Sequence, residues 1–267
     1  MSQRIIECVP NFSEGRDKAV IRQITAAIEA SGGVKLLDVD PGEATNRTVV
    51  TFVGEPEAVV EAAFAGVKRA AELIDMRRHK GAHPRMGATD VLPLIPIAGV
   101  TLAECAELAR ALARRIADEL RIPTYCYEAA AFAPERKNLA VCRAGEYEAL
   151  PEKLAHTASA PDFGARPFDE GVARTGATTV GARDFLIAVN FNLNTTSLKK
   201  WNFRAEERQR PDIQLRRMCW TSWHRIIRSY QKYWNTDSLR SLSLRMQTGW
   251  RGTFRKMEGS MESSIRQ

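Results

Sequence analysis

One short stretch of this chain, residues 77–90, gathers side chains that could do chemistry. It reads RRHKGAHPRMGATD and holds two of the four histidines together with several cations. Gly81, Pro84 and Gly87 interrupt any regular helix there, so the stretch is expected to be a loop. Pro84 favours an extended backbone at His83, which lets its imidazole project from the loop. A neutral imidazole takes up and returns protons near neutral pH, so this loop suggests acid–base catalysis.

The two histidines of this loop could instead be metal ligands or structural residues. His79 and His83 are four residues apart, the spacing of helical metal ligands. The glycines and the proline exclude that helix, and no Cys or Glu lies nearby to complete a ligand set, so we expect no metal. By pattern alone, a loop histidine is more often solvent-exposed or held in a structural hydrogen bond, and that alternative stays open here.

The apolar pattern indicates the elements that must position this loop. β-branched and apolar runs predict strands at residues 5–9, 34–39, 48–53, 91–97, 124–127 and 185–190. Apolar residues at helical spacing predict helices at residues 17–30, 56–74, 101–120 and 145–155. The connection between the second and third strands is too short for a helical crossover, so these two strands should be antiparallel neighbours.

The order of these elements is β-α-β-β-α-β, followed by α-β and a further strand. It predicts an α+β fold of the ferredoxin-like, split βαβ type with additions. Such a fold has one mixed sheet with helices on one face. The other face is still apolar, so it needs a cover, which a second layer or a partner subunit could provide. Residues 164–181 are rich in glycine and are expected to form a loop, and residues 11–15 a turn.

Length and composition bound the class of protein. A chain of 267 residues forms one large domain or two small ones. The chain does not open on an apolar signal region, and no run approaches the ~18 apolar residues of a membrane span, so we expect neither secretion nor a membrane. The five cysteines are scattered without a C-x-x-C pair, which fits a reducing, cytoplasmic setting.

The net charge of +7 is unevenly distributed along the chain. Residues 1–197 are nearly neutral, whereas residues 198–267 form a basic tail that holds all five tryptophans. In this tail Arg, Ser, Trp and Gln are mixed without turn or cap patterns. A basic, tryptophan-rich tail could bind nucleic acid or a membrane surface. We favour the other interpretation, that the tail is an out-of-frame translation and not a native domain.

Several long stretches match one known family, in the right order along the chain. They are ECVPNFSEG, LLDVDPG, TNRTVVTFVG, HKGAHPRMGATDV, RAGEYEALPEKL, APDFG and TGATTVGARDFLIAVNFNLNT. From about Ile6 to Thr196 the chain resembles glutamate formimidoyltransferase, the formiminotransferase of histidine degradation. The resemblance implies an enzyme of one-carbon metabolism. It would transfer a formimidoyl group between N-formimidoyl-L-glutamate and tetrahydrofolate, with tetrahydrofolate as the co-substrate.

The resemblance also implies where the reaction takes place. The catalytic histidine of the family lies in the HPRMG motif, which here is His83, the expected general base and then acid. A carboxylate should fix its tautomer, and Asp40, at the exit of a predicted strand, is our choice, with Asp38 second. Folate binding is implied for the segment after PDFG: Gly164, Ala165, Arg166, Pro167, Phe168, Asp169, Glu170, Gly171, Val172 and Ala173.

Both substrates carry carboxylates, which suit the planar fork of arginine. The candidate substrate-binding residues are Asn46, Arg47, Arg78, Arg85 and Arg183, all near loops or strand ends. For the arginines the plain alternative is a solvated surface cation, and for Asn46 it is turn chemistry.

In the family this resemblance names, two similar subdomains face each other with folate between them, and the enzyme is usually a homodimer. The present chain departs from the family pattern after about Lys200, where the second subdomain should begin. Two alternatives to an active transferase therefore remain. One is a catalytically impaired, folate-binding fragment, and the other is a basic protein whose tail binds nucleic acid.

Overall fold

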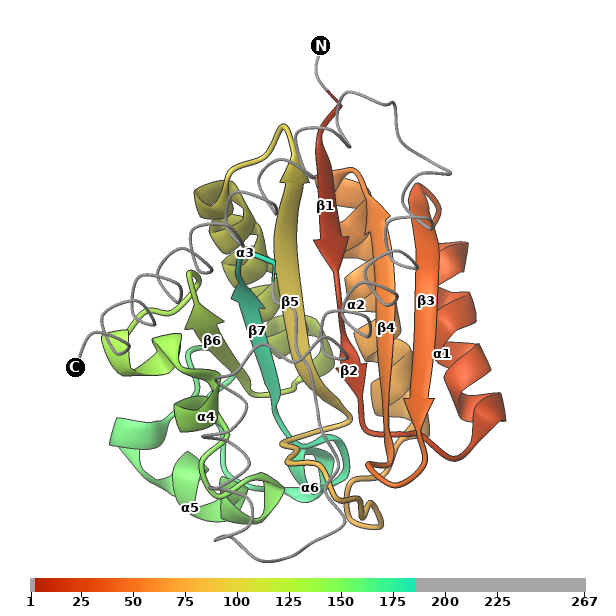
Figure 1. Cartoon of the computed structure of the whole chain (residues 1–267). Helices are drawn as coiled ribbons and strands as arrows, with labels where there is room; N and C mark the ends of the chain where they lie inside the picture. Colours follow the sequence, from red (N-terminus) through yellow and green to blue (C-terminus); the bar gives the residue numbers. More distant parts are fainter. Residues whose placement is uncertain (1–2, 186–267) are drawn as a thin grey trace, which may run out of the picture. The chain divides into compact units, whose positions relative to one another are not determined.

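The structure is a computed structural model, and it describes residues 3–185 (Figure 1). The basic tail at 198–267 lies outside the described residues, as does the strand expected at 185–190 except for Phe185, which is not in a strand. Within residues 3–185, no helix has both the length and the apolar character needed to cross a membrane.

A mixed sheet of seven strands forms the centre of the described part. The strands are β1 (Ile5–Cys8), β2 (Asn11–Phe12), β3 (Val34–Gly42), β4 (Arg47–Gly54), β5 (Thr89–Ala98), β6 (Thr124–Glu128) and β7 (Thr178–Ala182). β3 pairs with β4. β1 and β2 follow one another in the same row of the sheet, and this row lies between β4 and β5. All these pairs are antiparallel. β7 then joins β5 in parallel and β6 joins β7 in parallel.

Three long helices, α1 (Lys18–Ala30), α2 (Pro56–Leu73) and α3 (Leu102–Leu120), cover one face of this sheet (Figure 1). Their inward residues share one core with Phe52 of β4 and Leu92 of β5. The capping box of Thr101 and Glu104 opens α3 as expected. The antiparallel row β3-β4-β1-β5, with α1 and α2 as its crossovers, confirms the α+β fold with a split βαβ arrangement.

Shorter elements surround the lower end of the sheet. They are α4 (Leu139–Cys142), α5 (Leu150–Ala155), α6 (Glu170–Thr175) and the 3₁₀ turns η1 (Pro134–Lys137), η2 (Tyr147–Ala149) and η3 (Thr157–Ser159). Cys142 of α4 packs on Val91 and Tyr127, whose neighbours in their strands belong to the main core. Because side chains alternate along a strand, α4 covers part of the sheet face that the long helices leave open.

Two segments that the sequence predicts to be irregular contain regular elements, so these two predictions are wrong. The stretch 164–181 contains α6 and the strand β7, which lies fully buried between two parallel neighbours. Such a strand shows no polar alternation, so its sequence TTVGA gave no strand signal. Residues Asn11 and Phe12, expected in a turn, form β2, which continues the row of β1 after Pro10. The predicted antiparallel pair at 34–39 and 48–53 is confirmed as β3 and β4.

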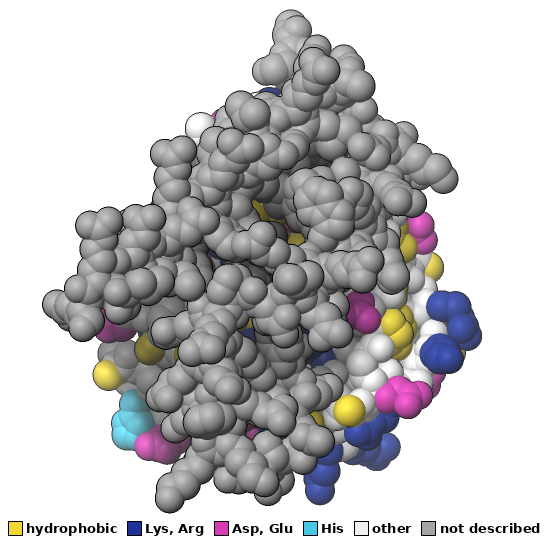
Figure 2. Space-filling model, viewed as in Figure 1, with side chains coloured by type: hydrophobic (Ala, Val, Ile, Leu, Met, Phe, Trp, Pro, Cys, Tyr) yellow, Lys and Arg dark blue, Asp and Glu magenta, His cyan; other side chains and the backbone are white. Residues whose placement is uncertain are grey.

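Figure 2 shows the surface from the same side as Figure 1. Where described residues are visible at its right-hand edge, Lys and Arg side chains alternate with Asp and Glu. Charges of both signs, mixed in this way, are typical of an ordinary solvated surface.

Candidate active site

The loop between α2 and β5 is fastened from both sides, so it forms a rigid platform for its histidines. Met76 N and Ala88 N donate to carbonyl oxygens of the α6 segment, each at 2.8 Å. On the opposite side, Ala82 N donates to Ala44 O at 3.2 Å. Gly81 is needed there, because a Cβ at this position would lie 2.1 Å from Thr45 O.

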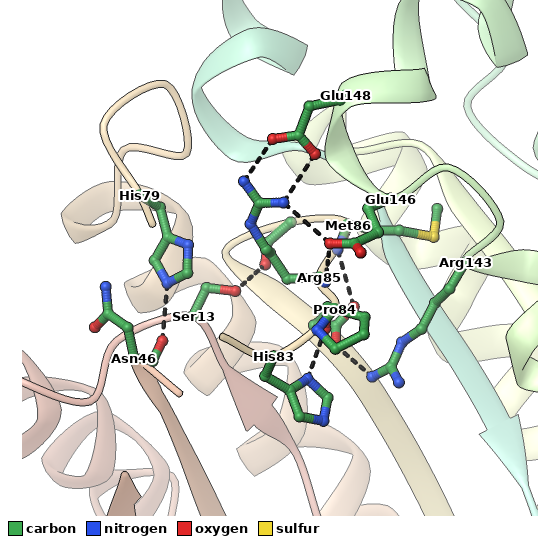
Figure 3. Close-up of polar contacts among 12 residues, drawn as sticks. Ser13, Asn46, His79, His83, Pro84, Arg85, Met86, Arg143, Glu146 and Glu148 are labelled. Atoms are coloured by element: carbon green, nitrogen blue, oxygen red, sulfur yellow. Dashed lines mark hydrogen bonds and ion pairs between the residues drawn. The ribbon is translucent and has the colours of Figure 1, made fainter. Parts of the chain in front are cut away.

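His79 is a structural histidine. It is 8% exposed, and its Nε2 lies 2.8 Å from the backbone oxygen of Asn46, to which it donates (Figure 3). Nδ1 is buried without a hydrogen-bond partner among the described residues. Burial is the main cause that lowers the pKa of His79. The ring is therefore neutral near pH 7 and holds the loop in place.

Asn46 joins three segments of backbone. Its Oδ1 accepts from Gly15 N and its Nδ2 donates to Lys80 O, both at 3.0 Å. It adopts a left-handed backbone, with φ of 48°, which Asn tolerates better than most residues. Asn46 thus has a structural role in a turn, and its side-chain oxygen and nitrogen both bond to backbone atoms.

Both ring nitrogens of His83 have hydrogen-bond partners, and one of these is an arginine. Its Nδ1 lies 2.6 Å from Pro84 O, and its Nε2 lies 2.6 Å from Arg47 Nη1. A carbonyl oxygen can only accept and a guanidinium can only donate, so the proton resides on Nδ1 and Nε2 accepts from Arg47. The neutral ring is therefore held in one tautomer, with Nε2 as the basic atom.

The surroundings of His83 favour this neutral form. Partial burial is the first cause that lowers the pKa of His83, and the charges of Arg47 and Arg143 lower it further. The hydrogen bond to Pro84 O and the charge of Asp90 act in the opposite direction. His83 is thus ready to accept a proton over a wide range of pH around neutrality.

Asp90 and Arg143 are charged neighbours of His83 that the sequence reasoning missed. Asn11 pairs with Val91 and Phe12 with Thr89, so Asp90 is the extra residue of a bulge in β5. A bulge changes the direction of a side chain, and Asp90 contacts Met86 N at 3.0 Å and the guanidinium of Arg143. Burial raises the pKa of Asp90, and the pairing with Arg143 opposes that rise.

Asp90 and Arg143 both lie within the motifs on which the family resemblance is based. Asp90 ends the stretch HPRMGATD, and Arg143 begins RAGEYEAL. A charged residue inside a long matching motif is a candidate for the site, although only the bulge shows that Asp90 reaches it.

Residues 5–183 match the family model described as formiminotransferase domain, N-terminal subdomain.

The chain belongs to the formiminotransferase family.

Named relatives support the assignment. The chain is 56% identical over 196 residues to formimidoyltransferase-cyclodeaminase of Rattus norvegicus, a match that covers 73% of this chain and 36% of the relative. It is 48% identical over 195 residues to glutamate formimidoyltransferase of Streptococcus pyogenes serotype M1, covering 73% of this chain and 64% of the relative. The glutamate formimidoyltransferase of Thermoplasma acidophilum is 47% identical over 197 residues with the same coverage. The chain thus spans less than two thirds of these relatives.

Asp40 lies on the same sheet face as Arg47 and does not contact the ring of His83. Asp40 is opposite Val49 in the pairing of β3 with β4, so Arg47 lies two residues further along that face. The charge of Asp40 raises the pKa of Arg47, while both ring nitrogens of His83 are occupied by Arg47 and Pro84. In this formiminotransferase-family chain, a backbone carbonyl fixes the tautomer, and Asp40 is not among the causes that shift the pKa of His83.

Arg85 is committed to the fold. Its guanidinium bonds Glu148 at 2.8 and 2.7 Å and Glu146 at 3.1 Å (Figure 3). The side chain is 13% exposed, and the pairs fasten η2 to the histidine loop. Of the other candidates, Arg78 is exposed in the same loop, and Arg183 donates to Asp184 O at 3.0 Å.

The implied folate segment has a structural part and an exposed part. Arg166 pairs with Asp169, whose Oδ1 also accepts from Val172 N at 2.9 Å and so caps α6. Val172 is fully buried, and Phe168 lies edge-on to Tyr147, with ring centres 6.4 Å apart. The exposed members are Ala165, Pro167, Glu170 and Gly171, of which Glu170 pairs with Arg77 at 2.5 Å.

Within the described residues, no group of three or more His, Cys, Asp or Glu side chains is arranged to hold a metal ion.

Proposed function

We propose that this chain transfers a formimidoyl group between N-formimidoyl-L-glutamate and tetrahydrofolate, with His83 as the proton carrier. The observation that supports this proposal is the state of the ring. Its Nδ1 donates a hydrogen bond to Pro84 O, so the lone pair of the ring is on Nε2. That lone pair accepts from Arg47 Nη1. Membership of the formiminotransferase family supplies the reaction class.

The proposed reaction needs one group that first takes and then returns a proton. An amine nitrogen of tetrahydrofolate attacks the formimidoyl carbon, and its proton passes to His83 Nε2. When the bond from that carbon to the amine of glutamate breaks, Nε2 returns the proton to the leaving nitrogen. One neutral imidazole serves both steps, and no net proton is gained or lost.

Arg47 connects substrate binding to the basicity of His83. The positive charge of Arg47 disfavours a proton on Nε2. We propose that a substrate carboxylate binds the guanidinium of Arg47, draws it away from Nε2 and neutralises its charge. His83 then becomes a stronger base only when the substrate is present. Asp40, whose charge acts on Arg47, is proposed to position that guanidinium.

Tetrahydrofolate is proposed to bind along the exposed part of the segment 164–173. The hydrogen bonds from Met76 N and Ala88 N tie the α6 segment to the histidine loop. Folate on the exposed residues of this segment would therefore rest on the same fastened unit as His83. The homodimer implied by the resemblance remains part of this proposal.

An assay of the full chain tests the proposal. The chain is mixed with N-formimidoyl-L-glutamate and tetrahydrofolate, and release of glutamate is followed over time. We expect glutamate release that requires both substrates. Tetrahydrofolate binding without glutamate release would instead support the folate-binding fragment, an alternative motivated by the partial coverage of the relatives.

A further inference from the structure

Arg143, at the end of α4, has donors that no other described residue uses. Its side chain is 15% exposed, and it contacts Asp90 through Nη2. Its Nε is buried and has no partner among the described residues. A buried donor without a partner is costly, so an arginine held in this way is suited to a ligand that accepts the remaining hydrogen bonds.

Arg85 shows how a structural arginine in the same region differs. Its exposure is similar, at 13%, and its Nε also lacks a partner. However, both of its terminal nitrogens bond to Glu148, which forms a complete fork. Asp90 does not form such a fork with Arg143: one of its oxygens accepts from Nη2 of Arg143, and the other accepts from Met86 N. Among the described residues, the guanidinium of Arg143 is therefore anchored through Nη2 alone.

Two arginines and two carboxylates surround the ring of His83. Arg143 pairs with Asp90, the charge of Asp40 acts on Arg47, and His83 is neutral in the tautomer described above. The charges of Arg47 and Arg143 both disfavour a proton on His83. A carboxylate ligand beside Arg143 would accept hydrogen bonds from the donors that Asp90 leaves unused.

We propose that Arg143, anchored by Asp90, binds a substrate carboxylate beside His83 and so helps to determine substrate specificity. This inference rests on the proposed function and names a residue for carboxylate recognition. The ligand chemistry has two possible sources, the glutamate of the donor substrate and the glutamate tail of folate. Arginine suits either one, because its planar donors match the two oxygens of a carboxylate.

The substitution Arg143→Lys tests this role, because it keeps the charge next to Asp90 and removes the planar donors. Binding of L-glutamate, tetrahydrofolate and tetrahydropteroate, which lacks the glutamate tail, is measured by calorimetry on the full chain. We expect the Kd for L-glutamate to rise roughly tenfold or more. If the folate tail is the source, the Kd for tetrahydrofolate rises instead and that for tetrahydropteroate stays constant.

Arg136→Lys is a matched control. Arg136 is 18% exposed and pairs at 2.7 Å with Asp162, whose other oxygen accepts from Cys126 N at 2.7 Å. This pair repeats the arrangement of Arg143 with Asp90, but Arg136 is not among the causes that shift the pKa of His83. Arg136→Lys should leave the Kd values of all three ligands within about twofold of wild type.

Unchanged Kd values for both carboxylate ligands in Arg143→Lys would overturn the inference and leave Arg143 as a counter-ion of Asp90. If thermal melting shows that this variant is unfolded, Arg143→Gln replaces it, since its amide can still donate to Asp90. A wild-type chain that binds the ligands but releases no glutamate from the donor would contradict the proposed function while leaving this inference standing. A wild-type chain that binds neither carboxylate ligand would overturn both.

Discussion

Two histidines of one loop differ in role because their ring nitrogens have different partners. His79 is buried, and it donates to Asn46 O. His83 donates to Pro84 O and accepts from Arg47 through its second nitrogen. The sequence motif predicts that His83 is the reactive residue, but it does not reveal what fixes the tautomer. The sequence favours Asp40 for that role, whereas in the structure Nδ1 donates to the backbone oxygen of Pro84, which no sequence pattern marks.

The buried His79 predicts a loss of stability in mild acid. Its pKa lies below 6.5 in the folded chain, so the unfolded chain binds its proton first as the pH falls. The contribution of neutral His79 to the free energy of unfolding is complete above pH 6.5. It is lost as the pH falls toward the lower pKa of the folded state. His79→Gln keeps an N–H donor for Asn46 O but cannot titrate. Urea unfolding at about pH 7 and about pH 5 should therefore show a smaller decrease for this variant than for wild type.

The matched control for this measurement is His156→Gln, since His156 is exposed. That variant should keep the pH dependence of the wild type. An equal decrease in wild type and His79→Gln would show that His79 is not the titrating group.

Arg47 is predicted to hold down the pKa of His83. Partial burial is the larger cause of the lowered value, and the charge of Arg47 adds to it. In Arg47→Met the pKa of His83 should rise, because a protonated ring no longer faces a guanidinium. NMR titration of the His83 ring resonances in the ligand-free chain measures this shift. Arg69→Met, on the outer surface of α2, is the control, and an equal pKa in all three proteins would contradict the electrostatic account.

At the scale of elements, the long amphipathic pieces were predictable and the short buried ones were not. α1, α2 and α3 follow the helical period over 13 to 19 residues, so composition and spacing identify them. α4 has four residues and β7 has five, too few for a period to emerge. The bulge that turns Asp90 toward Arg143 depends on pairing with β2, which no local pattern encodes.

The close packing of the histidine loop at Gly81 predicts that Gly81→Ala destabilises the fold. The new Cβ would lie 2.1 Å from Thr45 O, and the conflict is with backbone that cannot easily move. We expect a loss of roughly 1–3 kcal/mol in the free energy of unfolding, the usual cost of overpacking. Gly171→Ala is the control, because the nearest atom there is a side-chain oxygen at 3.2 Å. Equal urea midpoints for Gly81→Ala and wild type would contradict the packing argument.

At the scale of the whole molecule, the relatives match this chain over 195 to 197 residues, although it has 267. We propose that the basic segment from about residue 198 onward results from a lost reading frame. The coding DNA around codon 200 tests this proposal. Translation in one of the two other frames should continue with a sequence similar to the second part of the glutamate formimidoyltransferases. The absence of such a continuation from both frames would contradict it.

The most direct test of the account is the turnover of His83→Ala beside that of wild type, measured with the full chain and both substrates. Because the ring is proposed to carry the proton in both steps, we expect glutamate release to fall by roughly 10² to 10⁴. Tetrahydrofolate affinity should stay within about twofold of wild type, since the proposed folate contacts are made by residues of the segment 164–173 and not by the ring. The exposed His156, replaced by Ala, should leave both quantities unchanged. Near-normal glutamate release from His83→Ala would contradict the central claim that His83 carries the proton.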